Sequence, residues 1–461
     1  MNSSNTIFFT IFVIVNIVLR FFSIEGATFL EGADSSQYIN PAINIINHGS
    51  FSEDNDSLFT IGTPLYSILL LIPIKFFGFD SALSVIVLIQ CLLLFITGML
   101  GRLILCQIFE SCKGGYIVQG LIIFNPNSLI TAHLIQSETL FTLFLTTALL
   151  FSFRLIKYPS VRNSIFVGIF FGLLALTRPA GLYFALAMPI FVFIASIVRS
   201  SKSEIKEGIN KFVKLSFLMV ITSMLIMTPW YARNYIETNE VFLSSNSGYY
   251  LRDQYIQLLK IGRGWNEKET IKYINNKTYD YYEINKIDPT CLTKLRHWAC
   301  KDDLSRAIVD GIINEPFKHH ARALLESWSY LYFSGGASNI RNYLGILGKN
   351  KMVSFQRDKH DGFNGIISLI QSLEYQYLYI LLLTTSFSII TRIYGAIGVY
   401  YLIKNRNYWP YLIILLGVVI LSMGMYLYLG QSRFRVPIEP ILMLFAAASL
   451  LGKKEAKGEN Y

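Results

Sequence analysis

The sequence has few charged residues and lacks the common motifs of nucleotide and metal chemistry. Asp, Glu, Lys and Arg make up 15% of the 461 residues, whereas soluble domains contain about 25%. This deficit predicts that much of the chain lies in lipid. No dinucleotide fingerprint or Walker loop is present, so neither ATP nor a nucleotide sugar is suggested. The five cysteines show no CxxC or CxxH spacing, which argues against a metal site.

A cleavable leader, internal repeats and a single basic patch are also lacking. The apolar segment 6–24 has no basic stretch before it and no small-residue cleavage site, so we expect a retained membrane span. The net charge of +10 is spread over many loops, and no nucleic-acid partner is expected. No repeat or low-complexity tract stands out.

Long apolar segments are the main feature of the sequence. Spanning about 30 Å of hydrocarbon takes around 20 residues. The candidate spans are 6–24, 81–101, 116–133, 137–153, 164–177, 181–198, 213–230, 376–403, 408–428 and 436–451. The run 64–77 has 14 residues, contains two prolines and carries Lys75, so we interpret it as an interfacial or re-entrant helix. The sequence therefore predicts an all-α polytopic membrane protein with about ten transmembrane helices.

The charges of the loops predict the orientation. The loops and tail 101–115, 154–163, 199–214, 404–407 and 452–461 contain 15 Lys and Arg against five Asp and Glu. The first long loop, 25–80, contains seven acids against Lys75. Because Lys and Arg favour cytoplasmic loops, we expect the amino terminus inside and loop 25–80 outside. The long polar segment 231–375 then also lies outside, where a disulfide between Cys291 and Cys300 is permitted.

Two acidic residues on this outer face are candidates for catalysis. Asp34 lies about ten residues beyond the first span, where a carboxylate is hydrated yet close to lipid headgroups. Glu138 follows Ser137 at the hairpin between 116–133 and 137–153. An acid beside hydrocarbon is costly and is usually paired or functional. A helix N-cap at Ser137 and Glu138 explains the same pattern equally well.

Four arginines lie in three loops on the same predicted face, against the positive-inside bias. They are Arg178, Arg233, Arg433 and Arg435. One such arginine would be explained by snorkelling beside an interfacial aromatic belt. Four of them opposite an acidic loop suggest an anionic ligand, because guanidinium groups bind phosphate in forked, charge-assisted geometry. The nearby headgroup layer favours a phospholipid or a polyprenyl phosphate.

Together these residues predict transfer from a lipid-phosphate donor. Asp34 would serve as the general base that takes a proton from the acceptor. The arginines would stabilise the charge on the departing phosphate. A divalent cation could bridge Asp34 and the phosphate, although nothing in the sequence requires a metal or another cofactor.

Short motifs in a characteristic order carry a resemblance to a known family. They are Asp34 with Tyr38, Gly49, Gly62-Thr63-Pro64-Leu65-Tyr66, Asn125-Pro126, Ser137-Glu138, Leu176-Thr177-Arg178-Pro179-Ala180-Gly181, Pro229-Trp230, Arg233-Asn234-Tyr235 and Arg433-Phe434-Arg435-Val436-Pro437. The chain resembles the GT-C superfamily of polytopic glycosyltransferases, of the protein O-mannosyltransferase and lipid A aminoarabinose transferase type. The resemblance implies an inverting transferase that uses a polyprenyl-phosphate-linked sugar. It implies that the carboxylates of Asp34 and Glu138 are catalytic and that Tyr38 lies beside the substrate.

The resemblance also implies a division of the chain. Residues 1–230 would form the transmembrane catalytic module with outer loop 25–80, residues 231–375 an extracytoplasmic segment, and residues 376–461 the last spans and a cytoplasmic tail. The expected partners are a polyprenyl-linked sugar, membrane lipids and an acceptor lipid, glycan or protein. The expected location is a bacterial inner membrane with the active site outside. A lipid-linked glycan ligase or polymerase of another fold, and a secondary transporter, remain alternatives.

Overall fold

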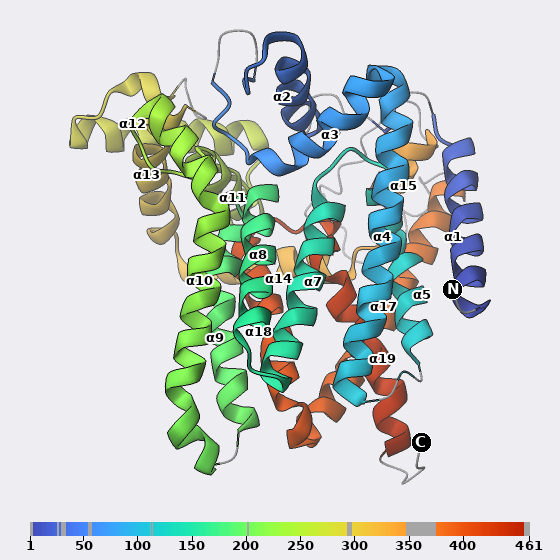
Figure 1. Cartoon of the computed structure of the whole chain (residues 1–461). Coiled ribbons are helices and arrows are strands. Elements are labelled where there is room, and N and C mark those ends of the chain that lie inside the picture. Colours follow the sequence, from blue (N-terminus) through green and yellow to red (C-terminus); the bar gives the residue numbers. More distant parts are fainter. Residues whose placement is uncertain are drawn as a thin grey trace.

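The structure is a computed structural model in which helices form a tall bundle (Figure 1). It describes residues 3–24, 27–28, 34–53, 58–110, 112, 114–200, 202–292, 297–346 and 375–455. The first half of the chain contains α1 (Ser3–Phe21), α2 (Asp34–His48), α3 (Pro64–Phe77), α4 (Phe79–Phe109), α5 (Gly115–Ile123), α6 (Pro126–Ala132), α7 (Glu138–Lys157), α8 (Val161–Thr177), α9 (Gly181–Arg199) and α10 (Lys202–Thr238). Within the described ranges no strand occurs, and a single bridge pairs Ser52 with Leu58.

The second half adds a group of shorter helices and then three long ones. They are α11 (Ser247–Gly262), α12 (Glu267–Asn285), η1 (Pro289–Leu292), η2 (Trp298–Cys300), α13 (Lys301–Ile313), α14 (Phe317–Phe333), α15 (Ala337–Leu344), α17 (Tyr375–Lys404), η3 (Arg406–Tyr408), α18 (Trp409–Met425), η4 (Ser432–Ile438) and α19 (Glu439–Glu455). The helices α11 to α14 contribute their own apolar core, built around Tyr255, Leu259 and Leu304. Cys291 and Cys300 form a disulfide.

Seven helices in the described part of the chain are long and apolar enough to cross a membrane. They correspond to seven of the ten predicted spans, so the chain is an integral membrane protein. The predicted spans 6–24 and 164–177 are shorter apolar helices. The run 116–133, expected as one span, is divided into α5 and α6. Asn125 causes this division because its side chain accepts from the N–H groups of Asn127 and Ser128 and starts a new helix at Pro126.

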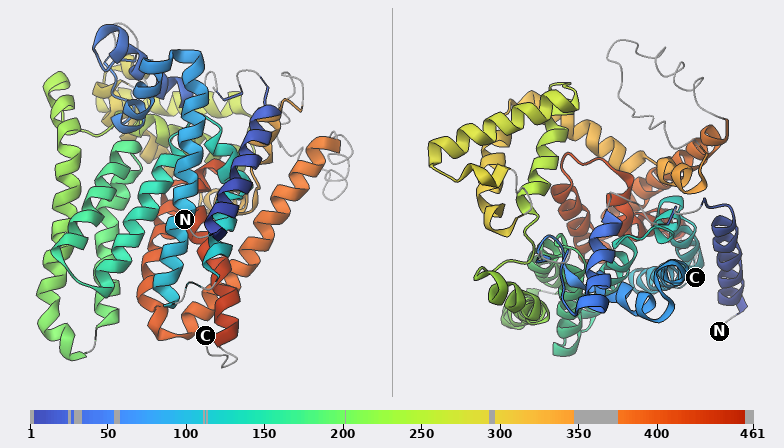
Figure 2. Two further views of the ribbon diagram at one scale, coloured as in Figure 1. Left: turned by 45° about the vertical axis from the view of Figure 1, so that its right-hand side comes forward. Right: turned by 90° about the horizontal axis from the view of Figure 1, so that it is seen from above.

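The two helices of the first loop lie across one end of the bundle. In Figure 1, α2 and α3 lie at the top, above α7 and α8, and we call this the upper end. The helix α3 coincides with the run expected to be interfacial. The basic loops between α8 and α7, and after α9, lie at the opposite, lower end (Figures 1 and 2).

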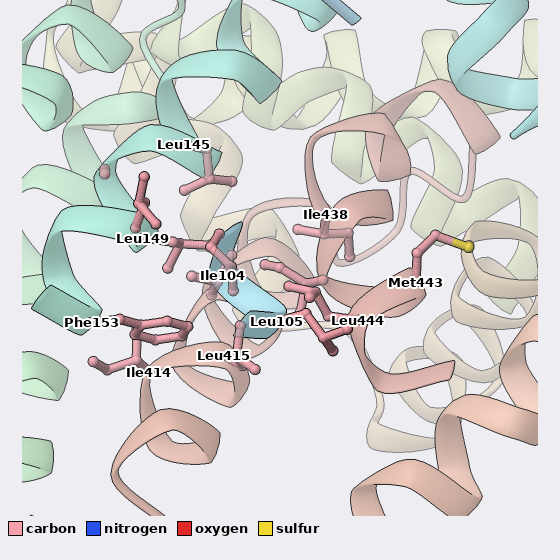
Figure 3. Packing of buried hydrophobic residues seen from close by; sticks show 14 of the residues in the cluster. Ile104, Leu105, Leu145, Leu149, Phe153, Ile414, Leu415, Ile438, Met443 and Leu444 are labelled. Carbon is pink, nitrogen blue, oxygen red and sulfur yellow. The ribbon is translucent and has the colours of Figure 1, made fainter. Parts of the chain in front are cut away.

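The bundle core is apolar and lies between α4, α7, α18 and α19. Figure 3 shows this packing, with Leu105 of α4, Phe153 of α7, Leu415 of α18 and Leu444 of α19 among the contributing side chains. The helix α19 is almost wholly buried, whereas most of α10 and α17 is not. Burial of α19 on all sides makes it the central helix, while α10 and α17 expose isoleucine and leucine, as expected of helices that face lipid.

Small residues allow α8 to approach α10 closely. A Cβ at Gly168 would lie 2.6 Å from the carbonyl oxygen of Met219, and one at Gly172 would lie 2.6 Å from Cβ of Ile226. Glycines four residues apart in a membrane helix are typical of such close helix packing.

Candidate active site

The start of α2 is held against the hairpin that joins α6 to α7. Tyr38 and Ser137 share a hydrogen bond of 2.9 Å between their hydroxyl oxygens. The Ser35 hydroxyl donates to the carbonyl of Ile135, also at 2.9 Å. The start of α2 and the Ser137-Glu138 motif therefore meet, although Tyr38 and Ser137 lie 99 residues apart in the sequence. The helix α2 begins at Asp34.

Buried polar groups of α3 and α4 fix the hairpin. The Tyr38 ring packs edge-on against Tyr66 of α3, with the centroids 4.9 Å apart. The Tyr66 hydroxyl donates to Oε1 of Gln90 at 2.7 Å. The Gln90 amide in turn donates to the carbonyls of Ala132 and Leu134 at 3.0 and 2.8 Å. This network explains how a loop between two helices can hold Ser137 and Glu138 in one place.

Glu138 is paired with Arg178. The carboxylate is 1% exposed and the arginine side chain 13%, and Nη1 of Arg178 forms an ion pair with Oε1 of Glu138. Neither carboxylate oxygen has a hydrogen-bond partner of ordinary geometry among the described residues. The Ser137 side chain does not cap α7 and bonds to Tyr38 instead. A buried carboxylate at a helix start, with one cation and unused acceptor capacity, is suited to contact a ligand.

Arg178 also faces the segment 231–375 at α11. It interacts electrostatically with Tyr250 of α11, whose hydroxyl donates to the carbonyl of Met425 at 2.8 Å. The next residue, Tyr426, stacks on Phe434 with the ring centroids 4.6 Å apart. The loop that carries Arg433 is thereby linked to the same region as Glu138 and Arg178.

Arg433 lies half-buried at the start of η4. Its guanidinium carbon is 4.8 Å from the centre of the Phe434 ring. The Asn127 amide of α6 donates to the carbonyl of Ser432 at 2.7 Å. This bond fixes the start of η4 beside the helix that precedes the hairpin.

Arg233 binds the backbone of the first loop. Nη1 donates to the carbonyl of Phe59 at 2.7 Å, and Nη2 donates to that of Phe51 at 2.9 Å. The guanidinium also lies 4.8 Å from the Trp230 ring. Arg233 thus ties the upper end of α10 to loop 51–59.

Arg435 is fully buried in a charge cluster that the sequence analysis missed. Its Nε donates to Glu439, whose other oxygen accepts from Arg392 of α17 at 2.9 Å. Its remaining donors reach the carbonyls of Leu331 and Ser334 at the end of α14. The signal for this cluster was Glu439, which lies one helical turn after Arg435, opposite the mid-span cation Arg392.

The described side chains, which do not include that of Asp34, contain no group of three or more His, Cys, Asp or Glu that could hold a metal ion. Tyr38, Glu138 and Arg178 are brought together through Ser137, and Arg433 is linked to them through Tyr426 and Phe434. Arg233 lies in α10 and Arg435 in η4, and both bond to the protein backbone.

No family model and no curated protein matches the chain by sequence. Among solved structures, the archaeal oligosaccharyltransferase AglB from Archaeoglobus fulgidus, in complex with an inhibitory peptide and a dolichol-phosphate, superposes with a TM-score of 0.53. The identity is 16%, and the match covers 97% of this chain and 50% of AglB, so the chain spans about half of its length. A second AglB structure, with Zn and sulfate, gives the same TM-score at 14% identity.

ArnT from Cupriavidus metallidurans, bound to undecaprenyl phosphate, matches 98% of this chain and 79% of its own, with 14% identity and a TM-score of 0.40. The motifs in their order along the chain and the superposition on AglB agree on the fold. The chain therefore shares its fold with about half of AglB.

Proposed function

We propose that the protein is an inverting glycosyltransferase that moves a sugar from a polyprenyl-phosphate donor to an acceptor outside the cytoplasm. The observation that carries this proposal is the convergence of α2, the Ser137-Glu138 hairpin and Arg178 at the upper end of the bundle. Position 34 lies one helical turn before Tyr38, so both positions share one face of α2. The fold and the dolichol-phosphate in the AglB complex support a polyprenyl-phosphate donor.

Asp34 acts as the general base in this proposal. It takes the proton from the acceptor hydroxyl or amine as that atom attacks the anomeric carbon of the sugar. The bond between the anomeric carbon and the phosphate oxygen breaks on the opposite face, which inverts the configuration. The polyprenyl phosphate leaves with the bonding electrons, and its added negative charge is stabilised by guanidinium groups.

The arginines have two roles in this scheme. Arg178 and Arg433 bind the lipid phosphate, with Glu138 orienting Arg178. Arg233 and Arg435 hold the surrounding backbone in place and do not bind the phosphate. Their donors already bond to the carbonyls of Phe51 and Phe59 and to that of Ser334 at the end of α14. We assign the upper end to the outer face of a bacterial inner membrane, in line with the basic loops at the lower end.

The test compares Asp34→Asn with a matched control variant, Asp80→Asn. Asp80 is an exposed acid in the first turn of α4. Mass spectrometry of lipid extracts from cells with and without the gene first identifies the accumulated sugar-phosphate-polyprenol. That lipid is then supplied to the purified protein in vesicles, with envelope extract as the acceptor.

The proposal expects the D34N variant to transfer sugar at least about 100-fold more slowly, the usual scale for loss of a general base. The D80N variant should match the parent protein at an equal protein level. A fully active D34N variant would remove Asp34 from the mechanism. Movement of the sugar lipid across the vesicle membrane without transfer would instead identify a transporter.

A further inference from the structure

The helix α14 has two distinct faces. Ala323, Ser327 and Leu331 point into the protein and are buried. The opposite face carries Leu325 and Phe333, which are 70% and 47% exposed. Phe317 at the start of the helix is 84% exposed. Seen from above, α14 runs along one edge of the molecule (Figure 2).

The end of α14 lies at the depth of the membrane spans. Nε of Arg392 donates to the carbonyl of Tyr332 at 3.2 Å. Arg392 lies 12 residues before the end of α17 at Lys404, which is roughly 18 Å along this tilted helix from its lower end (Figure 2). The hydrocarbon layer is about 30 Å thick. Tyr332, and with it Phe333, therefore lies at the depth of the hydrocarbon layer.

The surface next to this contact is apolar as well. On α17, Ile389, Ile390 and Ile393 are 41%, 52% and 55% exposed. The exposed face of α14 is thus continuous with the face that α17 presents to lipid. An exposed Leu or Phe at this depth meets acyl chains rather than water, so its exposure costs nothing.

Two cations complete the exposed face of α14. Lys318 and Arg322 lie one helical turn apart, both are exposed, and neither forms an ion pair with a described residue. They precede Leu325 and Phe333 along the helix. Long basic side chains beside an apolar stripe are the pattern of a helix that lies in the membrane interface and meets anionic headgroups.

We propose that α14 is an amphipathic interfacial helix seated in the upper leaflet, with Leu325 and Phe333 among acyl chains and Lys318 and Arg322 at anionic lipid headgroups. This proposal rests on the contacts of α14 and is independent of the reaction. It gives the leaflet a direct connection to η4, because the carbonyls of Leu331 and Ser334 accept hydrogen bonds from Arg435.

Spin-label accessibility tests the seat of the helix. A nitroxide is attached to the full-length protein in lipid vesicles at L325C, at F333C or, as the control, at I284C. Ile284 is 79% exposed near the end of α12, at the top of the molecule in Figure 1. The proposal expects the ratio of oxygen collisions to collisions with a water-soluble nickel chelate to be several-fold higher at Leu325 and Phe333 than at Ile284. Equal ratios at all three positions would overturn it.

The headgroup contact is tested with two lipid mixtures. The L325C label is compared in phosphatidylcholine vesicles and in vesicles that also contain phosphatidylglycerol. The proposal expects phosphatidylglycerol to lower the mobility of the label, and expects Lys318→Gln with Arg322→Gln to remove that effect. An effect of the same size in the double variant, or no effect in the parent, would overturn the role of the two cations.

Discussion

Removing Arg178 should destabilise the protein far more than removing an exposed arginine does. In an Arg178→Met variant, Glu138 remains 1% exposed and loses its only ion-pair partner among the described residues. Breaking a buried pair in this way costs about 3–5 kcal/mol, because an uncompensated charge stays behind. The matched control is Arg306→Met. Arg306 is 71% exposed and pairs with Asp303 at 3.9 Å, a kind of contact that contributes about 0–1 kcal/mol.

The double variant Glu138→Gln with Arg178→Met separates stability from function. Replacing both charges removes the buried, unpaired carboxylate, so most of the lost stability should return. If Arg178 binds the lipid phosphate, as proposed, the double variant stays inactive although it is stable. Thermal unfolding in detergent and sugar transfer in vesicles provide the two readouts. A loss of 3 kcal/mol corresponds to an apparent melting temperature roughly 3 °C lower in a chain of this size.

Two results would refute this reasoning. If the R178M variant melts like the R306M variant, the ion pair does not hold Glu138 in the protein. If the double variant recovers transfer together with stability, Arg178 serves only as the counter-ion of Glu138 and the phosphate is bound elsewhere.

Two further predictions concern packing and pH. Gly172→Ala should lower stability by about 1–3 kcal/mol, because the new methyl group would lie 2.6 Å from Cβ of Ile226. The control Gly424→Ala should cost little, because nothing lies within 4 Å of the new methyl group there. Equal melting temperatures of the two variants would contradict the packing of α8 against α10. Burial alone would raise the pKa of Glu315, but hydrogen bonds from Arg263 and His319 outweigh it and lower this pKa. The ionised Glu315 therefore contributes fully to stability above about pH 4.5, and this contribution is lost as the pH falls below that value. A Glu315→Gln variant should lose less stability than the parent protein between pH 6 and pH 4. Chemical denaturation at a series of fixed pH values measures this difference.

Seven of the ten predicted spans followed from hydropathy, because hydropathy depends on local composition. The run 116–133 differs from the prediction for a local reason. Its mean apolarity is that of a span, but Asn125 and Pro126 start a new helix inside it. The break depends on helix capping, and an average of hydropathy over many residues does not detect a cap. The dipeptide itself was visible in the sequence.

The site was predictable only in part. The motifs placed Glu138 and Arg178 on one face, but their pairing joins loops 40 residues apart and depends on how α7 and α8 pack. The partners of Arg233 and Arg435 were beyond sequence analysis for another reason. They are backbone carbonyls of Phe59 and Ser334, and every residue carries such a group.

A hydrogen-bond network joins α1 to a residue that lies far along the chain. Nε2 of His133 lies 2.9 Å from Oδ1 of Asn16 in α1, and Nδ1 lies 2.9 Å from the hydroxyl of Tyr343 in α15. During translation, 327 residues separate Asn16 from Tyr343, a delay of roughly 16–65 s at ribosomal speeds of about 5–20 residues per second. The network that includes Asn16 of α1 is therefore complete only after Tyr343 has been made, and a nascent chain stalled before Tyr343 should hold α1 more loosely.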